Sequence, residues 1–213
     1  MHGASTFFLA PLYAALVVAL ILAERAGSRA GMWATKPLTS LVFVAMGLSD
    51  GLPDTSAGRL LLTALVFSFA GDLCLIPTEA RVFRAGILLF LLAHVAFVGA
   101  FLALGVAWAW AALALLPLAG AAWRVARWIL RGVPHELRRA VVAYVVVITA
   151  MVATAAGAVA AGASPLLLVA ALAFWTNDIL VARDRFVTKT WVNRAMGLPL
   201  YYGAMLLFAL HVA

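Results

Sequence analysis

The sequence predicts an all-α integral membrane protein, a bundle of eight transmembrane helices that forms a single domain over residues 1–213. Three observations lead to this prediction. Of the 213 residues, 67% are hydrophobic and only 11% are charged. Apolar segments long enough to cross a bilayer recur along the whole chain. Arginine and lysine concentrate in every second link between these segments.

The composition argues against a soluble domain. Soluble proteins are about half apolar and about a quarter charged, whereas this chain has a mean hydropathy of +1.11. The single cysteine, Cys74, cannot form an intrachain disulfide. A formal net charge of +7 could indicate a nucleic-acid partner, but the basic residues are dispersed over short links. We therefore expect no nucleic-acid partner.

Eight segments have the length of a spanning helix, which is about 20 mostly apolar residues. The first has no basic region before it, and its apolar run is long for the apolar region of a signal peptide, so we interpret it as a transmembrane helix. Gly105 and Gly162 suit the two tightest links. The second segment is the shortest. The predicted spans are residues 7–23, 37–52, 60–77, 85–104, 106–123, 140–161, 164–182 and 195–213.

The basic residues predict the orientation of these spans. The links after spans one, three, five and seven contain every arginine and lysine except Arg59. The positive-inside rule then assigns these four links to the cytoplasm and both termini to the non-cytoplasmic side. Removing the second span would destroy this alternation, so the charge pattern supports eight spans. We expect a multi-pass protein of a bacterial inner membrane.

Two aspartates, Asp72 and Asp178, lie within spans where no predicted helix end accommodates them. An aspartate at the centre of a spanning helix costs about 2.5–3.5 kcal/mol on translocon scales. Each lies five residues, or about 8 Å, before the predicted inner end of its span. Other polar residues belong to the same inner half, where polar side chains usually face the bundle interior. These candidate partners are Lys36, His94, Tyr144, Asn177, Arg185, Tyr201 and Tyr202.

Each candidate also has a structural interpretation. Either aspartate could bond to a neighbouring helix, and His94 could be a satisfied core histidine. One of Tyr201 and Tyr202 could belong to an interfacial aromatic belt, and Lys36 could snorkel at a span end. The aspartates occupy the third span of each half, and both follow an aromatic residue by three positions. This similarity predicts a 4+4 parallel repeat about an axis along the membrane normal.

Two carboxylates in a low-dielectric site are suited to acid–base chemistry. If they lie close together, like-charge repulsion would leave one proton shared between them. One could then donate a proton while the other activates water, as in glycosidases with oxocarbenium-like transition states. No Gly-x-Ser-x-Gly motif is present, and Cys74 has no neighbouring histidine in sequence. A zinc site requires more than one histidine within the membrane, so we expect no metal and no cofactor.

Six stretches together resemble the lysoplasmalogenase (YhhN-like) family. They cover most of the chain and occur in the same order as in that family. Asn177 stands where a serine is expected, and Gly203–Ala204 stands where the family often has Ala–Gln. The stretches are "KPLTS" (36–40), "FSFAGDLCLI" (67–76), "FRAGILLFLLAHVAFVGAF" (83–101), "AYVVVITAM" (143–151), "FWTNDILVARDRF" (174–186) and "YYGAMLL" (201–207).

The resemblance implies an ether hydrolase that cleaves the vinyl-ether bond of lysoplasmalogen-type lysophospholipids. The products would be a fatty aldehyde and a glycerophospho-alcohol. Asp72 and Asp178 would be the acid–base pair, while His94 and a tyrosine would orient water or a carboxyl group. Lys36 and Arg185 would hold the lipid phosphate, at a site open towards the cytoplasmic leaflet. The partners we expect are therefore the lysophospholipid substrate and the bilayer.

Two other classes of function remain open from the residues alone. Intramembrane carboxylates with His94 could form a proton relay in a proton-coupled transporter of small solutes or lipids. A non-catalytic lipid-binding or scaffold protein would tolerate the loss of both carboxylates. Proton-driven uptake, aldehyde release and tolerance of aspartate substitution distinguish these three functions.

Overall fold

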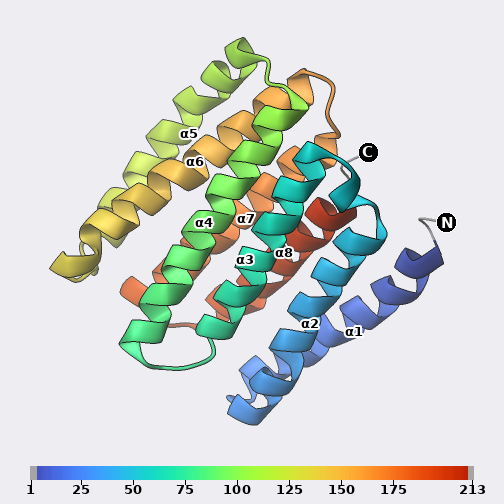
Figure 1. The fold of residues 1–213 in the computed structure, drawn as a ribbon. Coiled ribbons are helices and arrows are strands. Elements are labelled where there is room, and N and C mark those ends of the chain that lie inside the picture. Colours follow the sequence, from blue (N-terminus) through green and yellow to red (C-terminus); the bar gives the residue numbers. More distant parts are fainter. Residues whose placement is uncertain (1–3, 211–213) are drawn as a thin grey trace. The chain divides into compact units, whose positions relative to one another are not determined.

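The computed structural model describes residues 4–210, which fold into eight α-helices and two short 3-10 helices (Figure 1). Each predicted span corresponds to one helix, although residues 211–213 of the last predicted span lie outside the described residues. Five helices, α3 to α7, are long and apolar enough to cross a membrane. The helices are α1 (Ala4–Arg25), α2 (Arg29–Ser49), α3 (Ser56–Cys74), α4 (Ala80–Leu104), α5 (Trp108–Ile129), α6 (Arg138–Ala160), α7 (Pro165–Phe186) and α8 (Trp191–Leu210).

Helix α2 begins eight residues before the predicted span. Ser28 caps it, because its side-chain oxygen accepts a hydrogen bond from the Gly31 amide at 3.1 Å. Pro37 therefore lies inside the helix rather than at its start. As a result, Lys36 belongs to the helix body and not to the preceding link.

Helix α3 ends at Cys74, earlier than predicted. Pro77 disfavours helical backbone at Ile76, and the Leu75 amide closes the helix by donating to the Gly71 carbonyl at 3.1 Å. Asp72 is thus two residues, or about 3 Å, from its helix end. Asp178 is eight residues, or about 12 Å, from the end of α7 at Phe186. The prediction of equal distances to the two helix ends was wrong.

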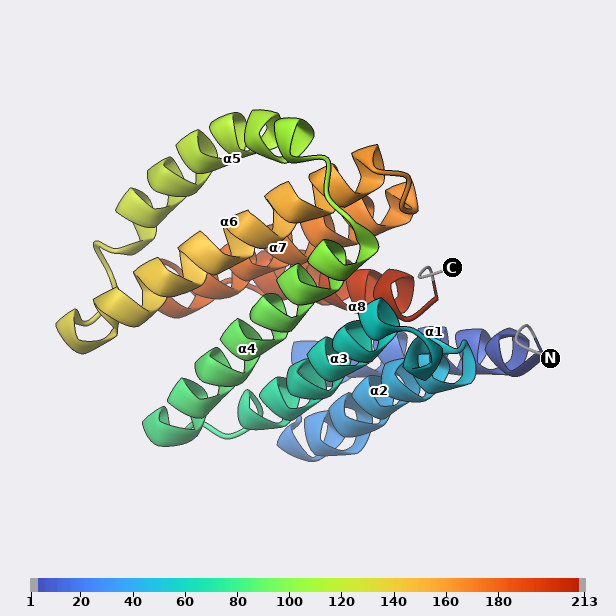
Figure 2. The same ribbon diagram turned by 45° about the horizontal axis from the view of Figure 1, so that its top comes forward.

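The chain divides into two compact units, and the first contains residues 1–100 and 205–213. In this unit α1 packs on α2, and α2 packs on α3 (Figure 2). Large buried side chains such as Leu20, Phe43 and Leu61 fill the unit. At its C-terminal end, the Phe208 ring lies 4.2 Å from the Phe97 ring between centroids. These contacts hold α2 and α3 side by side.

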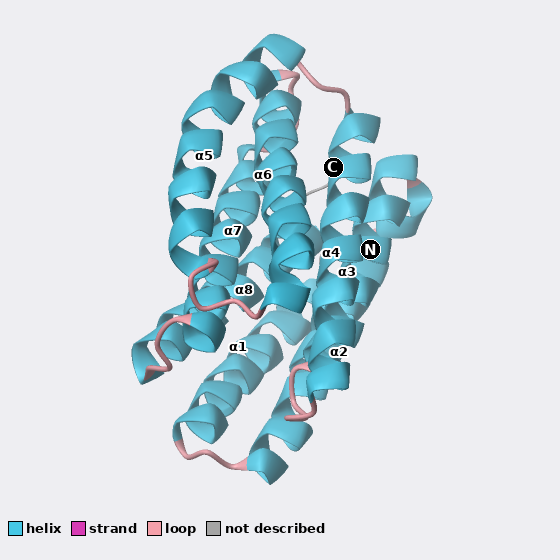
Figure 3. Ribbon diagram, turned by 90° about the vertical axis from the view of Figure 1, so that its left-hand side faces the viewer, coloured by secondary structure: helices cyan, strands magenta, loops and turns pink. Residues whose placement is uncertain are grey.

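The second unit contains residues 101–204. Here α5 packs on α6 and α6 packs on α7, which repeats the neighbour order of the first unit (Figure 3). The α5–α6 contact is close because α6 presents small residues. A Cβ atom added at Gly157 would lie 2.9 Å from the Ala111 Cβ atom, so only glycine fits there. This matching order agrees with a 4+4 repeat, which stays a prediction.

Candidate active site

The first unit contains a buried ion pair centred on Asp72. Asp72 is 2% exposed, and its Oδ1 atom lies 3.3 Å from the Lys36 ammonium of α2. Its Oδ2 atom accepts a hydrogen bond from the Ser40 hydroxyl at 2.7 Å. Lys36 and Ser40 are one helical turn apart, so both point to the same side of α2. Each carboxylate oxygen therefore has its own partner on the neighbouring helix.

Further polar groups surround this ion pair. The Tyr13 side chain on α1 is buried and lies within electrostatic range of the Asp72 carboxylate. Ser68, one turn before Asp72 on α3, is also fully buried. A Cβ atom at Gly71 would lie 2.7 Å from the Phe90 ring, so this glycine lets α4 pack against α3. The Asp72 centre is thus built from α1, α2 and α3, with α4 packed beside it.

His94 is a fully buried residue of α4. Its Nδ1 atom lies 2.6 Å from the Phe90 carbonyl oxygen. A carbonyl can only accept, so Nδ1 carries the hydrogen of this bond. The neutral ring then presents Nε2 as an acceptor. His94 can therefore orient a hydroxyl group through Nε2.

The second unit contains the Asp178 carboxylate, which is partly buried on α7. Its Oδ2 atom accepts a hydrogen bond from the Tyr144 hydroxyl of α6 at 2.6 Å. Its Oδ1 atom accepts from the Asn177 amide at 3.1 Å. A Cβ atom at Gly197 would lie 3.0 Å from the Asn177 oxygen, so α8 approaches α7 closely here. Tyr144 and Asn177 therefore hold the carboxylate in one orientation.

Both predicted tyrosines of α8 are buried, Tyr201 to 4% exposure and Tyr202 to 1%. The Tyr201 ring packs edge-on against Phe174 of α7, with 5.5 Å between centroids. The two tyrosine rings are 4.8 Å apart. Neither residue therefore behaves as an exposed interfacial aromatic, and both support the packing of α8 on α7.

The end of α7 carries a polar network that sequence analysis missed. The buried Asn193 amide nitrogen donates to the Asp184 carboxylate at 3.2 Å and to the Thr188 carbonyl at 2.8 Å. Arg183 donates to the Asn193 oxygen at 3.0 Å, and Arg194 lies 3.5 Å from Asp184. This network fixes the α7–α8 link. Beside it is a hollow of about 330 Å³ whose charged lining residues are Asp184, Arg185, Lys189 and Arg194.

The residues around Asp72 and around Asp178 are arranged in the same way. In each centre, a carboxylate on the third helix of a unit accepts a short hydrogen bond from a hydroxyl on the second helix. Ser40 precedes Asp72 by 32 residues, and Tyr144 precedes Asp178 by 34. This similarity follows from the packing order of the helices, which is the same for α1, α2 and α3 as for α5, α6 and α7.

Sequence analysis identified three members of these centres besides the aspartates, and one residue of the nearby hollow, but it missed others. Lys36 lies with Asp72, and Tyr144 and Asn177 lie with Asp178; Arg185 lines the hollow at the end of α7. Ser40 and Tyr13 were not anticipated, because a serine or tyrosine in an apolar helix costs little and gives no strong signal. The one available signal for Ser40 was its spacing of one turn from Lys36.

These features describe an all-helical protein with five helices long and apolar enough to cross a membrane and with a carboxylate centre in each unit. The chain belongs to the YhhN family, whose model matches residues 31–212. This match confirms the resemblance noted in the sequence. No curated protein and no solved structure matches the chain.

Proposed function

We propose that this protein is an intramembrane hydrolase that cleaves the vinyl-ether bond of lysoplasmalogen-type lysophospholipids. Membership of the YhhN family is consistent with such an activity. The observation that carries the proposal is that each intramembrane aspartate is held by a short hydrogen bond from a neighbouring helix. Carboxylates oriented in this way are suited to acid–base catalysis, which typically contributes about 10²–10⁴-fold.

The reaction needs one acid and one base. A carboxylic acid protonates the vinyl carbon remote from the ether oxygen, which gives an oxocarbenium ion. The second carboxylate stabilises this cation and takes a proton from the attacking water. The hemiacetal then collapses to a fatty aldehyde and a glycerophospho-alcohol, and proton transfer restores the acid. One water is consumed, and no oxidant or reductant is needed.

We assign the base to Asp72 and the acid to Asp178. In this proposal Asp72, which lies 3.3 Å from the Lys36 ammonium, is the carboxylate that stabilises the cation and accepts a proton. Asp178 has hydrogen-bond partners that are neutral, Tyr144 and Asn177. In this proposal both aspartates act on one substrate molecule, and His94 with Tyr201 or Tyr202 orients the water.

The basic hollow at the end of α7 supports a headgroup site. Arg185 is seven residues beyond Asp178, so the two side chains share a helix face about 10.5 Å apart along the axis. This separation is comparable with a glycerophosphate unit plus one charge-assisted hydrogen bond. We propose that Arg185 and Lys189 bind the lipid phosphate, while Arg194 stays paired with Asp184 in the lining of the hollow. Lys36 was expected to share this role, but its burial against Asp72 favours an ion-pair role instead.

The membrane arrangement proposed here follows the charge pattern. All eight helices would span a bacterial inner membrane, with both termini on the non-cytoplasmic side. The basic end of α7 would then open towards the cytoplasmic leaflet, where a lysophospholipid headgroup would lie.

Aldehyde release from lysoplasmalogen by the purified protein tests the function. An ester-linked lysophospholipid of equal chain length is the substrate control, and Asp54→Asn, at an exposed aspartate of the first unit, is the protein control. We expect aldehyde only from the vinyl ether, and we expect Asp72→Asn to abolish it. Equal turnover by Asp72→Asn and Asp54→Asn would refute the catalytic assignment.

One observation favours a second candidate, a proton-coupled transporter. Ionisable residues within membrane spans often mark ion pathways and proton relays, and Lys36 and Asp72 form a buried ion pair. Proteoliposomes carrying a pH gradient would then accumulate a solute or lipid, and no aldehyde would form. Aldehyde release without a gradient requirement favours the hydrolase.

A further inference from the structure

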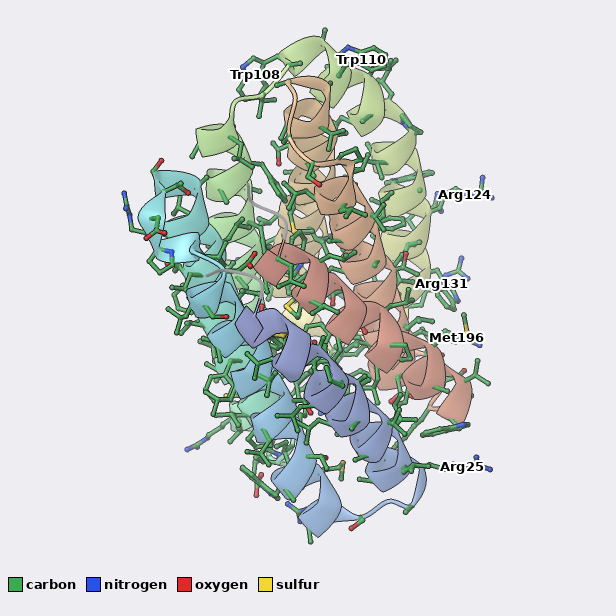
Figure 4. The ribbon with its side chains drawn as sticks, turned by 90° about the vertical axis from the view of Figure 1, so that its right-hand side faces the viewer. Arg25, Trp108, Trp110, Arg124, Arg131 and Met196 are labelled. Carbon is green, nitrogen blue, oxygen red and sulfur yellow. The ribbon has the colours of Figure 1, made fainter. Side chains whose placement is uncertain are left out.

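The exposed side of α5 carries a basic and aromatic cluster near its C-terminal end. Arg124, Arg127 and Arg131 are all exposed, and so are Trp123 at 60% and Trp128 at 38%. Arg124 and Arg127 lie three residues apart on one face of α5, and Arg131 lies in the turn just after the helix ends at Ile129. Figure 4 shows Arg124 and Arg131 projecting outward on the same side. This cluster has no part in the proposed catalytic chemistry.

A groove runs from these arginines towards the middle of α5. The end of the groove towards the middle of α5 is formed by Pro117, Gly120 and Ala121. The whole open hollow has a volume of about 650 Å³. No atom lies within 4 Å of a Cβ built at Gly120. Small residues on this face therefore leave a shallow apolar channel that leads away from the guanidinium groups.

The charge in the groove is uncompensated. Among the described residues, no carboxylate forms an ion pair with any of these three arginines. Arg127 instead lies over the Trp123 ring, 4.7 Å from its centroid. The three arginines belong to the C-terminal end of α5 and the turn that follows it. They form a compact positive site without a negative partner in the part of the chain described.

Tryptophans at both ends of α5 indicate where this site lies in a bilayer. Trp108 and Trp110 are exposed at the N-terminal end of α5 (Figure 4), and Trp123 and Trp128 are exposed near its C-terminal end. From Trp108 to Trp128 the helix rises about 30 Å, which matches the thickness of the hydrocarbon core. Tryptophan concentrates at the two membrane interfaces. The arginines therefore lie at headgroup level, and the apolar channel points into the hydrocarbon.

We propose that this groove binds an anionic phospholipid of the bilayer. Its phosphate contacts Arg124, Arg127 and Arg131, and one acyl chain lies over Pro117, Gly120 and Ala121. Arginine suits this role because its planar fork binds phosphate through two parallel hydrogen bonds. The ligand is a resident bilayer lipid and not the hydrolysed substrate, since the groove lies on α5 and the candidate headgroup site lies at the end of α7.

A second copy of the chain is a poor occupant of the same face. A two-fold axis along the membrane normal brings residues of equal depth opposite one another. The three arginines of one copy would then face those of the other, and like charges repel. An anionic lipid instead neutralises the cluster.

Native mass spectrometry of the delipidated protein in neutral detergent tests the proposal. The probes are phosphatidylglycerol, phosphatidylcholine of the same chain length, and inorganic phosphate. We expect one phosphatidylglycerol to bind about tenfold or more tightly than phosphatidylcholine. Inorganic phosphate, which lacks the acyl chain, should not compete at equal concentration.

Two variants and one matched control make the test specific. The triple variant Arg124→Gln, Arg127→Gln, Arg131→Gln should lose the preference for phosphatidylglycerol. The control Arg81→Gln, Arg84→Gln, Arg139→Gln removes the same charge at other exposed sites and should retain it. Gly120→Leu fills the channel without changing charge and should weaken binding, while its unfolding temperature in lipid-free detergent stays unchanged. Equal loss in the groove and control variants, or a dimer that depends on the three arginines, would overturn the proposal.

Discussion

Replacing Lys36 with methionine tests most directly how much the Lys36–Asp72 ion pair contributes to the free energy of unfolding. The substitution keeps the length of the side chain but removes the ammonium 3.3 Å from the Asp72 carboxylate. At that distance the attraction is about 5 kcal/mol for an effective dielectric constant of about 20. Removing one member of a buried pair costs about 3–5 kcal/mol, because the other charge stays buried and uncompensated. We therefore expect Lys36→Met to lower the free energy of unfolding by about 3–5 kcal/mol.

A double-mutant cycle in mixed micelles measures this coupling. Lys36→Met with Asp72→Asn restores neutrality, so the double variant should be more stable than Lys36→Met alone. The interaction energy should reach about 2 kcal/mol or more, within the range known for contacting groups. Arg84→Met, at an exposed site on α4, should change stability by no more than about 0.5 kcal/mol. Additive single effects would show that Lys36 and Asp72 do not interact, which would refute this description of the centre.

Other predictions concern the neighbours of the two carboxylates. Tyr144→Phe removes the hydroxyl 2.6 Å from Asp178, which stabilises the carboxylate that forms as Asp178 donates its proton. The variant should lower kcat/KM about 10–100-fold, since hydrogen bonds to charged groups contribute roughly 1.5–3 kcal/mol. An unchanged rate would show that this bond is not used. Gly197→Ala places a Cβ atom 3.0 Å from the Asn177 oxygen and should slow aldehyde release by up to about tenfold. Gly203→Ala is the matched control, because a Cβ atom there has open space around it and should leave the rate unchanged. Equal rates for these two glycine variants would contradict the positioning role of Asn177. Arg185→Gln should raise KM for the lysolipid with little change in kcat, as measured by initial rates; a fall in kcat alone would exclude a headgroup role.

Most of the helical arrangement could be predicted because apolar length is a strong signal. All eight predicted segments contain a helix, but two boundaries depended on local chemistry. The Ser28 cap extends α2 backward past Pro37, and Pro77 shortens α3. These shifts moved Lys36 into a helix body and Asp72 into a final turn. The periodicity of apolar residues does not show where a capping residue begins a helix or where a proline ends one.

The site was partly predictable for a related reason. A charge in an apolar helix is costly, so Asp72, Asp178 and Lys36 could be recognised from sequence alone. Hydroxyl partners are not costly, and the rotation of each helix decides which hydroxyl meets a carboxylate. Tyr144 was found from its depth along the chain, whereas Ser40 and Tyr13 required the packing of α1, α2 and α3. The Asn193 network was missed because its partners come from a link and two helix ends.

The most direct test of the central claim compares Asp72→Asn, Asp178→Asn and the double variant in an assay of aldehyde release from lysoplasmalogen. Residues that act as a unit show non-additive effects. If the two carboxylates serve one reaction, each single variant should lose nearly all activity, and the double variant should be no slower than either. Near-normal aldehyde release by either folded single variant would contradict the account.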